Sequence, residues 1–135
     1  IGPLQPLLES SGRLHIIEKD TQSHPLGDGY RFHLSHGHTP GLLLAEIEMP
    51  TGPILFAGDL IPGAPWMHLP ITMGYDRYPE LLIEEKEKLL SNLVKRHGRV
   101  FFTHDHEVAV ANIAQDERGR FYAKNKLVDI NKISS

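Results

Sequence analysis

The stretch HGHTPG at residues 36–41 interrupts a part of the chain that otherwise predicts strands. Two glycines and a proline within six residues exclude a regular helix or strand, so the stretch predicts a turn. Residues 30–35 before it alternate aromatic or apolar side chains with polar ones, and residues 42–49 after it begin as an apolar run. Both patterns are typical of strands, so His38 lies just beyond the end of a predicted strand.

Two more polar side chains directly follow predicted buried strands. Asp59 ends the segment LFAGD at residues 55–59, and His104 stands in FFTHD at residues 101–105. Side chains at the ends of neighbouring strands in one sheet point into a common crevice. Two imidazoles and a carboxylate suit Zn²⁺, Mn²⁺, Fe²⁺ or Co²⁺, so His38, Asp59 and His104 are candidate metal ligands. Asp59 also fits an ordinary turn or helix cap, and the turn around His38 could simply tolerate a histidine.

Residues 79–97 predict the main helix. Proline suits its first position, and the basic residues 95–97 followed by Gly98 suit its end. Its leucines share one face, which predicts packing on a sheet, while the charged run at 84–88 predicts a solvent-exposed face. The long loop at 60–78 contains several prolines and glycines, and loops of this length in a compact domain are usually functional.

The remaining segments complete a single domain, residues 1–135, of class α/β (α+β). Short buried strands are predicted at 54–57 and 99–103, a further strand at 13–19, and a hairpin at 108–124 about the turn 116–119. The pattern predicts a mixed, mostly antiparallel sheet with one main helix on one face. Residues 1–12 predict a linker or short helix, and residues 125–135 a frayed tail.

Composition excludes several classes of protein. The formal net charge of −3 gives no electrostatic case for binding nucleic acid or an anionic membrane. No apolar run approaches the roughly 20 residues that a membrane span needs, and we expect no secretory signal. The chain has no cysteine, which excludes disulfides and thiolate metal sites and fits a cytoplasmic protein.

The succession of HGHTPG, LFAGD, a helix and FFTHD resembles the second half of the metallo-β-lactamase superfamily, over roughly residues 10–125. The resemblance implies the C-terminal half of a four-layer αββα sandwich. It implies a zinc site of two ions when complete, with His38, Asp59 and His104 as ligands and Asp59 bridging the ions in catalysis. The stretch at 58–79 is most similar to the lactonase and parathion-hydrolase-like branch, which hydrolyses lactones, esters and related small molecules by a metal-bound hydroxide.

One motif of this superfamily is absent. The HxHxDH motif, which supplies most ligands of the metal pair, normally precedes GHTPG, and only 35 residues precede His36 here. The later stretch THDHEVA begins in the same way, but Val108 and Ala109 stand where Asp and His belong. We therefore expect a C-terminal fragment that is inactive or weakly active alone, and that associates with its missing N-terminal half or forms a homodimer.

Alternative functions remain open from the sequence. The chain could be a non-catalytic metal-binding or structural module that lost the HxHxDH half of the site. The intact parent could also belong to the oxygen-using di-iron members of the superfamily.

Several other residues are candidates for supporting roles. His36 is either a turn residue or a partner of a ligand, and Asp105 is either structural or a carboxylate that orients a ligand histidine. His68, Tyr75 and Asp76, in the long loop, are candidates for lining a substrate pocket.

Overall fold

The computed structural model describes residues 10–11, 20, 29–74 and 76–129. Its elements in chain order are β1 (Tyr30–Ser35), β2 (Leu42–Ile47), β3 (Ile54–Phe56), the 3-10 helices η1 (Gly58–Leu60) and η2 (Ala64–Met67), α2 (Pro79–Lys95), β4 (Arg99–Phe101), β5 (Val110–Gln115) and β6 (Phe121–Leu127). The strand predicted at 13–19 and nearly all of the linker or helix predicted at 1–12 lie outside the described residues.

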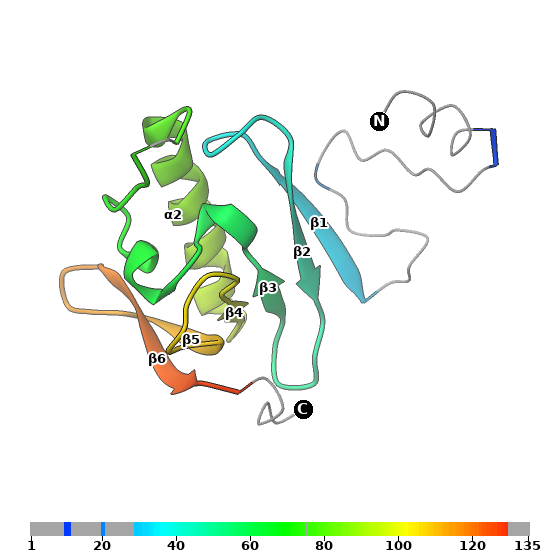
Figure 1. Ribbon diagram of the computed structural model, residues 1–135. Helices are drawn as coiled ribbons and strands as arrows, with labels where there is room; N and C mark the ends of the chain where they lie inside the picture. The colour runs from blue at the N-terminus through cyan, green and yellow to red at the C-terminus, as the bar shows by residue number, and fades with distance from the viewer. Residues whose placement is uncertain (1–9, 12–19, 21–28, 75, 130–135) are drawn as a thin grey trace.

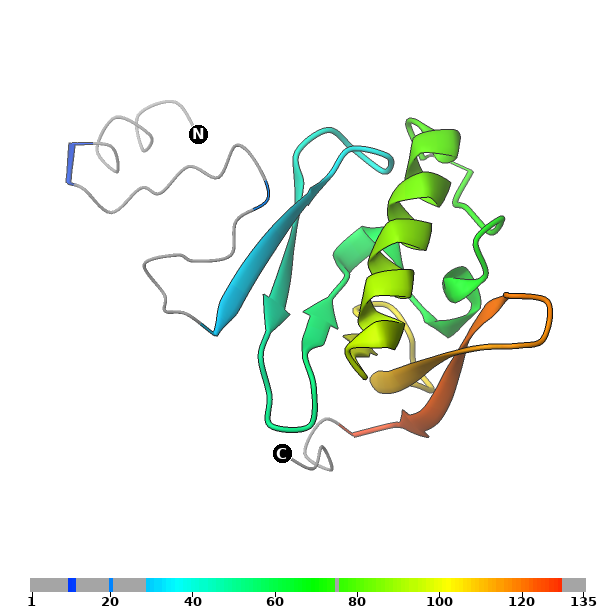
Figure 2. The same ribbon diagram turned by 180° about the vertical axis from the view of Figure 1, so that it is seen from behind.

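The six described strands form one sheet in which each strand neighbours the next in sequence, from β1 to β6. β3 and β4 pair in parallel, and the other neighbours pair antiparallel. A parallel pair needs a crossover connection, and here α2 makes it across one face of the sheet (Figures 1 and 2). The predicted mixed, mostly antiparallel sheet with one main helix is confirmed.

The face of the sheet that α2 covers carries the apolar core. Strand register places Leu55, Val100 and Ala111 in one row across three strands, and all three are fully buried. The same core contains three buried leucines of α2, namely Leu82, Leu90 and Leu93. Burying a leucine contributes roughly 1.5–3 kcal/mol, so these side chains hold α2 on the sheet.

A buried charge network ties the C-terminal end of α2 to β2. Glu46 lies in the same row as Leu55 and is 2% exposed. The Arg96 guanidinium donates hydrogen bonds to both carboxylate oxygens, and His33 Nε2 lies 3.0 Å from Oε2. Burial alone raises the pKa of Glu46, but the hydrogen bonds and charges of Arg96 and His33 outweigh burial and lower the pKa to about 2.

The end of α2 differs from the predicted end at residue 97. The helix ends at Lys95, and His97 adopts φ 57°, the left-handed conformation usual just after a helix. Gly98 N–H donates to Leu93 C=O at 2.8 Å, which completes the helix cap. Glycine also leaves room at position 98, because a Cβ there would lie 2.7 Å from Leu93 Cδ2 and that side chain would have to shift.

The predicted C-terminal hairpin is present as β5 and β6, with Gly119 in its turn at φ 77°. The prediction of a frayed tail from residue 125 is wrong for residues 125–127. β6 extends to Leu127, which pairs with Val110, because backbone hydrogen bonds form whatever the side chains are.

On the face opposite α2, the rings of Phe56 and Phe101 lie with centroids 4.9 Å apart, and Leu43 is 43% exposed. Association of this chain with a second copy or another half of a fold stays a prediction. In the part of the chain that the structure describes, no helix has both the length and the apolar character needed to cross a lipid bilayer.

Candidate metal site

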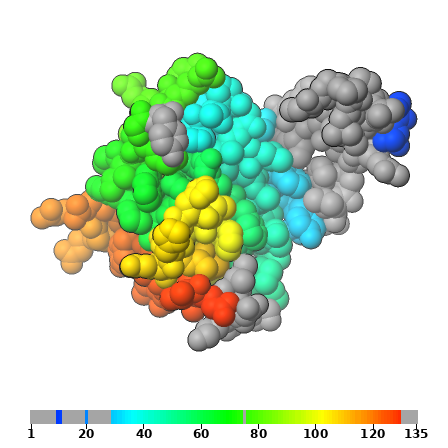
Figure 3. All heavy atoms as spheres, in the orientation of Figure 1, coloured from blue at the N-terminus to red at the C-terminus, as the bar shows by residue number. Residues whose placement is uncertain are grey.

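Two of the predicted ligands lie at one edge of the sheet, where β3 and β4 end. Because these strands are parallel, their carboxyl ends meet at the same edge. Asp59 follows β3 within η1, and His104 follows β4 in a segment that stands at the surface, yellow in Figure 3. Gly58 adopts φ 52°, a left-handed conformation that favours glycine, and this turns the chain from β3 into η1. His104 N–H donates to Pro62 C=O at 2.9 Å, which joins the two segments.

His38 reaches this edge from the turn between β1 and β2. Two backbone hydrogen bonds join the turn to the segment before α2: Arg77 N–H donates to His38 C=O at 3.1 Å, and Tyr78 N–H donates to Gly37 C=O at 2.8 Å. Gly37 lies so close to α2 that a Cβ would come within 2.4 Å of Leu82 Cα. HGHTPG therefore needs this glycine for close packing on the helix.

Glu85 of α2 fixes the same turn. Its carboxylate accepts hydrogen bonds from Ser35 Oγ at 3.0 Å, His36 N–H at 2.8 Å and Gly37 N–H at 2.8 Å. The prediction that the run 84–88 is a solvent-exposed face is therefore wrong for Glu85. A charged run on a helix predicts a solvated face, but the Glu85 carboxylate satisfies backbone donors of a turn far away in sequence.

The same prediction is wrong for Lys86, which is fully buried. Its ammonium group donates to three backbone carbonyls of the long loop, those of Trp66 at 2.9 Å, Ile71 at 2.7 Å and His68 at 3.4 Å. Burial lowers the pKa of Lys86 to about 8, against the opposing charge of Asp76. Helical spacing indicates this burial, because position 86 lies four residues from both Leu82 and Leu90 on the apolar face.

The structure brings the three predicted ligands together. His38 Nε2 lies 3.3 Å from Asp59 Oδ2, and His104 Nε2 lies 2.9 Å from Asp59 Oδ1. The Asp59 carboxylate thus lies between two imidazoles and presents one oxygen to each. His38 is 8% exposed, whereas the His104 side chain is 65% exposed, so the site is open on the His104 side.

Both imidazoles contact the Asp59 carboxylate directly, with His104 Nε2 at hydrogen-bonding distance from Oδ1. Over the described ranges, no group of three or more His, Cys, Asp or Glu side chains is arranged to hold a metal ion. The donor types nevertheless fit a divalent transition metal, since two imidazole nitrogens and a carboxylate are ordinary zinc ligands. Two ligands of a tetrahedral zinc lie about 3.3 Å apart, given bonds of about 2.0–2.1 Å. The distances of 2.9 and 3.3 Å to Asp59 are close to that spacing.

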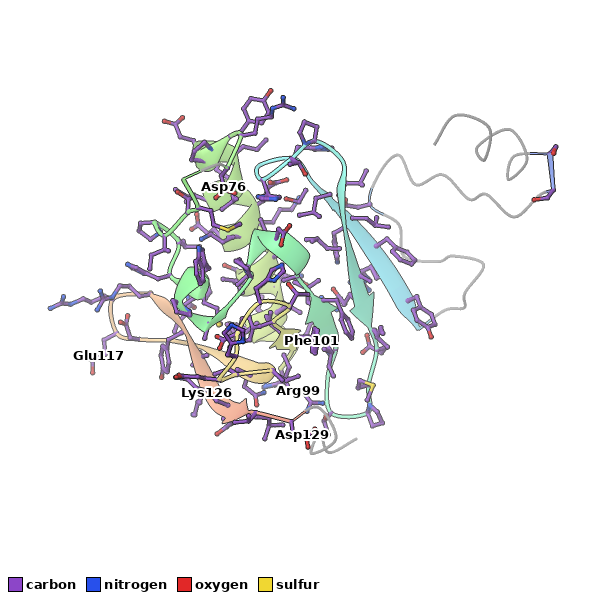
Figure 4. All side chains as sticks on the ribbon, in the orientation of Figure 1. Asp76, Arg99, Phe101, Glu117, Lys126 and Asp129 are labelled. Carbon is purple, nitrogen blue, oxygen red and sulfur yellow. The ribbon has the colours of Figure 1, made fainter. Side chains whose placement is uncertain are left out.

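Asp76 is the residue of this site whose role the sequence reasoning missed, because it was considered only for lining a pocket. Its Oδ1 lies 2.7 Å from His38 Nδ1, and its side chain is 1% exposed. Figure 4 places Asp76 where the β1–β2 turn meets the start of α2. An ionised carboxylate only accepts hydrogen bonds, so the proton lies on Nδ1 and Nε2 is left facing Asp59. One sequence signal was available: Asp76 is the only acidic residue between positions 60 and 78.

The other candidate residues lie away from the three predicted ligands or accept hydrogen bonds from backbone N–H groups. His36 is exposed, and its Nδ1 accepts from Gly41 N–H at 2.9 Å. Asp105 accepts three backbone N–H bonds, at 2.9 to 3.0 Å, and although burial raises its pKa these bonds lower it overall. His68 and Asp105 line a separate cavity of about 440 Å³, whose lining does not include the three predicted ligands. Tyr75 lies outside the described residues.

With this geometry in place, the comparisons with known proteins identify the family. Residues 4–104, which are more than half of the chain, match the family model described as the metallo-beta-lactamase superfamily. The chain belongs to the metallo-β-lactamase superfamily. A comparison with curated proteins gave no significant match.

Solved structures show that the chain has part of the metallo-β-lactamase fold. A probable metal-dependent hydrolase from Staphylococcus aureus matches with TM-score 0.68 and 24% identity, over 87% of this chain and 42% of that one. AidC, a dizinc quorum-quenching lactonase, matches with TM-score 0.66 and 20% identity, over 93% and 43%. An N-acyl homoserine lactone hydrolase with its product at the catalytic metal centre matches with TM-score 0.55 and 26% identity, over 67% and 35%. The chain spans less than half the length of these structures.

Proposed function

We propose that His38, Asp59 and His104 bind a divalent metal ion and contribute to the active site of a metal-dependent hydrolase of lactones or esters. The observation that carries the proposal is the convergence of two imidazole Nε2 atoms on one carboxylate, at 3.3 and 2.9 Å. Membership of the metallo-β-lactamase superfamily and the likeness to lactonases support hydrolysis as the reaction and a lactone as the substrate.

A bound divalent ion would supply Lewis acidity and a nucleophile at neutral pH. Zinc is the first choice because AidC is a dizinc lactonase, and the donor set also suits manganese, iron and cobalt. The side chains of this chain orient the ligands. Asp76 accepts the Nδ1 proton of His38 at 2.7 Å, which presents Nε2 as the ligand atom and fixes the ring. Asp59 presents one carboxylate oxygen to His38 and the other to His104, so its carboxylate would hold a bound ion together with these imidazoles.

Three ligands are fewer than two metal ions require, since a catalytic zinc usually has three protein ligands of its own. We therefore expect the 135-residue chain by itself to hydrolyse lactones weakly or not at all. Metal binding without turnover is therefore the result expected both for an incomplete hydrolase and for the alternative function, a non-catalytic metal-binding module, whereas Zn²⁺-dependent turnover, even if weak, would favour the hydrolase.

The test measures metal binding and turnover separately. Calorimetric titration with Zn²⁺ should show one ion per chain, and His104→Ala should weaken binding by more than the roughly 10- to 100-fold typical of losing a residue that only supports a ligand. His106→Ala is the matched control, because His106 is exposed two residues further along. Hydrolysis of N-hexanoyl homoserine lactone is then followed with and without added Zn²⁺. Equal Zn²⁺ affinity in wild type, His104→Ala and Asp59→Ala would overturn the assignment of the ligands.

A further inference from the structure

The buried ammonium group of Lys86 has a task that the apolar core does not explain. Lysine is almost never fully buried, and an apolar side chain at position 86 would continue the stripe between Leu82 and Leu90. What the ammonium group adds is three donors for the loop carbonyls of Trp66, His68 and Ile71. A fully buried ammonium group is costly without acceptors, so Lys86 and these loop carbonyls hold each other in this arrangement, and the loop depends on Lys86 for its conformation.

The loop that Lys86 holds leads directly to the candidate metal site. Beyond Ile71, Asp76 N–H donates to Met73 C=O at 3.0 Å, and Met73 N–H donates to Asp76 Oδ2 at 2.6 Å. These two bonds close a tight turn that aims the other oxygen, Oδ1, at His38 Nδ1. The charges of Lys86 and Asp76 also attract each other. A connected set of contacts therefore runs from the middle of α2 through the loop to His38.

We propose that Lys86 is a positioning residue for the candidate metal site: it fixes the loop that places Asp76 on His38. The proposal rests on the proposed function only in taking His38 as a ligand. In this proposal Lys86 acts through Asp76 and contacts neither substrate nor metal.

The first experiment compares Lys86→Met with Lys88→Met, a matched control at an exposed position on the same helix. Long-range ¹H–¹⁵N spectra of the histidine rings, recorded without metal, report the tautomer and hydrogen bonding of His38. Lys86→Met should change the His38 signals in the same direction as Asp76→Asn, whereas Lys88→Met should leave them unchanged. A purely structural loop anchor would leave the His38 signals of Lys86→Met like those of wild type, and that result would overturn the proposal.

A double-mutant cycle tests whether Lys86 acts through Asp76. Loss of a residue that orients a metal ligand weakens binding by roughly 10-fold or more, so each single variant should lower Zn²⁺ affinity by about that factor. If the two residues form one path, the variant carrying both Lys86→Met and Asp76→Asn should lose no more affinity than Asp76→Asn alone. Losses that multiply would show two independent effects and would contradict the proposal.

A second measurement covers the case in which Lys86→Met does not fold. Asp76→Asn keeps Lys86, and it should shift the side-chain signals of Lys86 as well as those of His38. Glu84→Gln, at an exposed position on α2, is the control that should shift neither. Unchanged Lys86 signals in Asp76→Asn would overturn the coupling.

The histidine spectra also separate this proposal from the proposed function. If wild type binds no Zn²⁺ but Lys86→Met still alters His38, the metal assignment fails and the positioning role holds. If Zn²⁺ binds at His38 with equal affinity in wild type and Lys86→Met, the positioning role fails and the metal assignment holds.

Discussion

Acid should weaken this fold through Glu46 in particular. The pKa of its carboxyl is about 2 in the folded protein, against an ordinary value of 4.5. The unfolded chain therefore takes up this proton at a higher pH than the folded chain does. The stabilisation is complete above pH 4.5 and is lost as the pH falls toward 2. At roughly 1.4 kcal/mol per pH unit, the difference between the two pKa values corresponds to about 3 kcal/mol.

The assay is urea unfolding followed by the fluorescence of Trp66, at several pH values from 7 to about 3. Glu46→Gln removes the ionised partner of Arg96, so its free energy of unfolding should be about 3 kcal/mol below that of wild type at pH 7. This gap should narrow steadily as the pH falls below 4.5. Glu87→Gln, at an exposed position on α2, should follow wild type throughout. A gap between wild type and Glu46→Gln that stays constant with pH would refute the reasoning.

Three further predictions concern packing and the loops. Gly37→Ala should lower the free energy of unfolding by about 1–3 kcal/mol, because its Cβ would clash with α2, and an unchanged melting temperature would contradict this. Asp105→Ala should lower the free energy of unfolding by roughly 2 kcal/mol and speed hydrogen exchange at the three backbone N–H groups that donate to Asp105. Native exchange rates at these groups would show that Asp105 does not hold them. Leu90→Ala should lower the free energy of unfolding by about 2–5 kcal/mol, whereas the exposed Leu81→Ala should lower it by under about 0.5 kcal/mol. Equal effects of the two variants in urea unfolding would disprove the assigned core.

Much of the fold could be predicted from local patterns. The alternation of residues 30–35 matches β1 in both bounds, and proline at position 79 marks the first residue of α2. Strand ends were less predictable. β4 ends at Phe101, two residues before the predicted end, because the chain there leaves the sheet edge towards His104. Local hydrophobicity does not show where a strand loses its neighbour.

The candidate site likewise has residues that could be predicted from the sequence and residues that could not. His38, Asp59 and His104 could be selected because each lies just beyond the end of a predicted strand, and the structure places them in contact. The parts played by Asp76 and Lys86 depend on tertiary contacts, with Asp76 meeting a histidine 38 positions away in sequence. Helical spacing places Lys86 on the apolar face of α2, but only the packing of the loop on α2 shows that its ammonium group binds the loop carbonyls.

The parallel pairing of β3 with β4 has a consequence for how the protein folds. Asp59 and His104 are 45 residues apart in sequence, and they meet only after the crossover through α2 has closed. Closing a long connection costs chain entropy before its contacts form, so parallel pairing tends to be slow. A folding intermediate built from β1, β2 and β3 would hold His38 and Asp59 without His104. If the proposed site binds a metal ion, binding that needs all three ligands should therefore come late in folding, and its rate would report when the crossover closes.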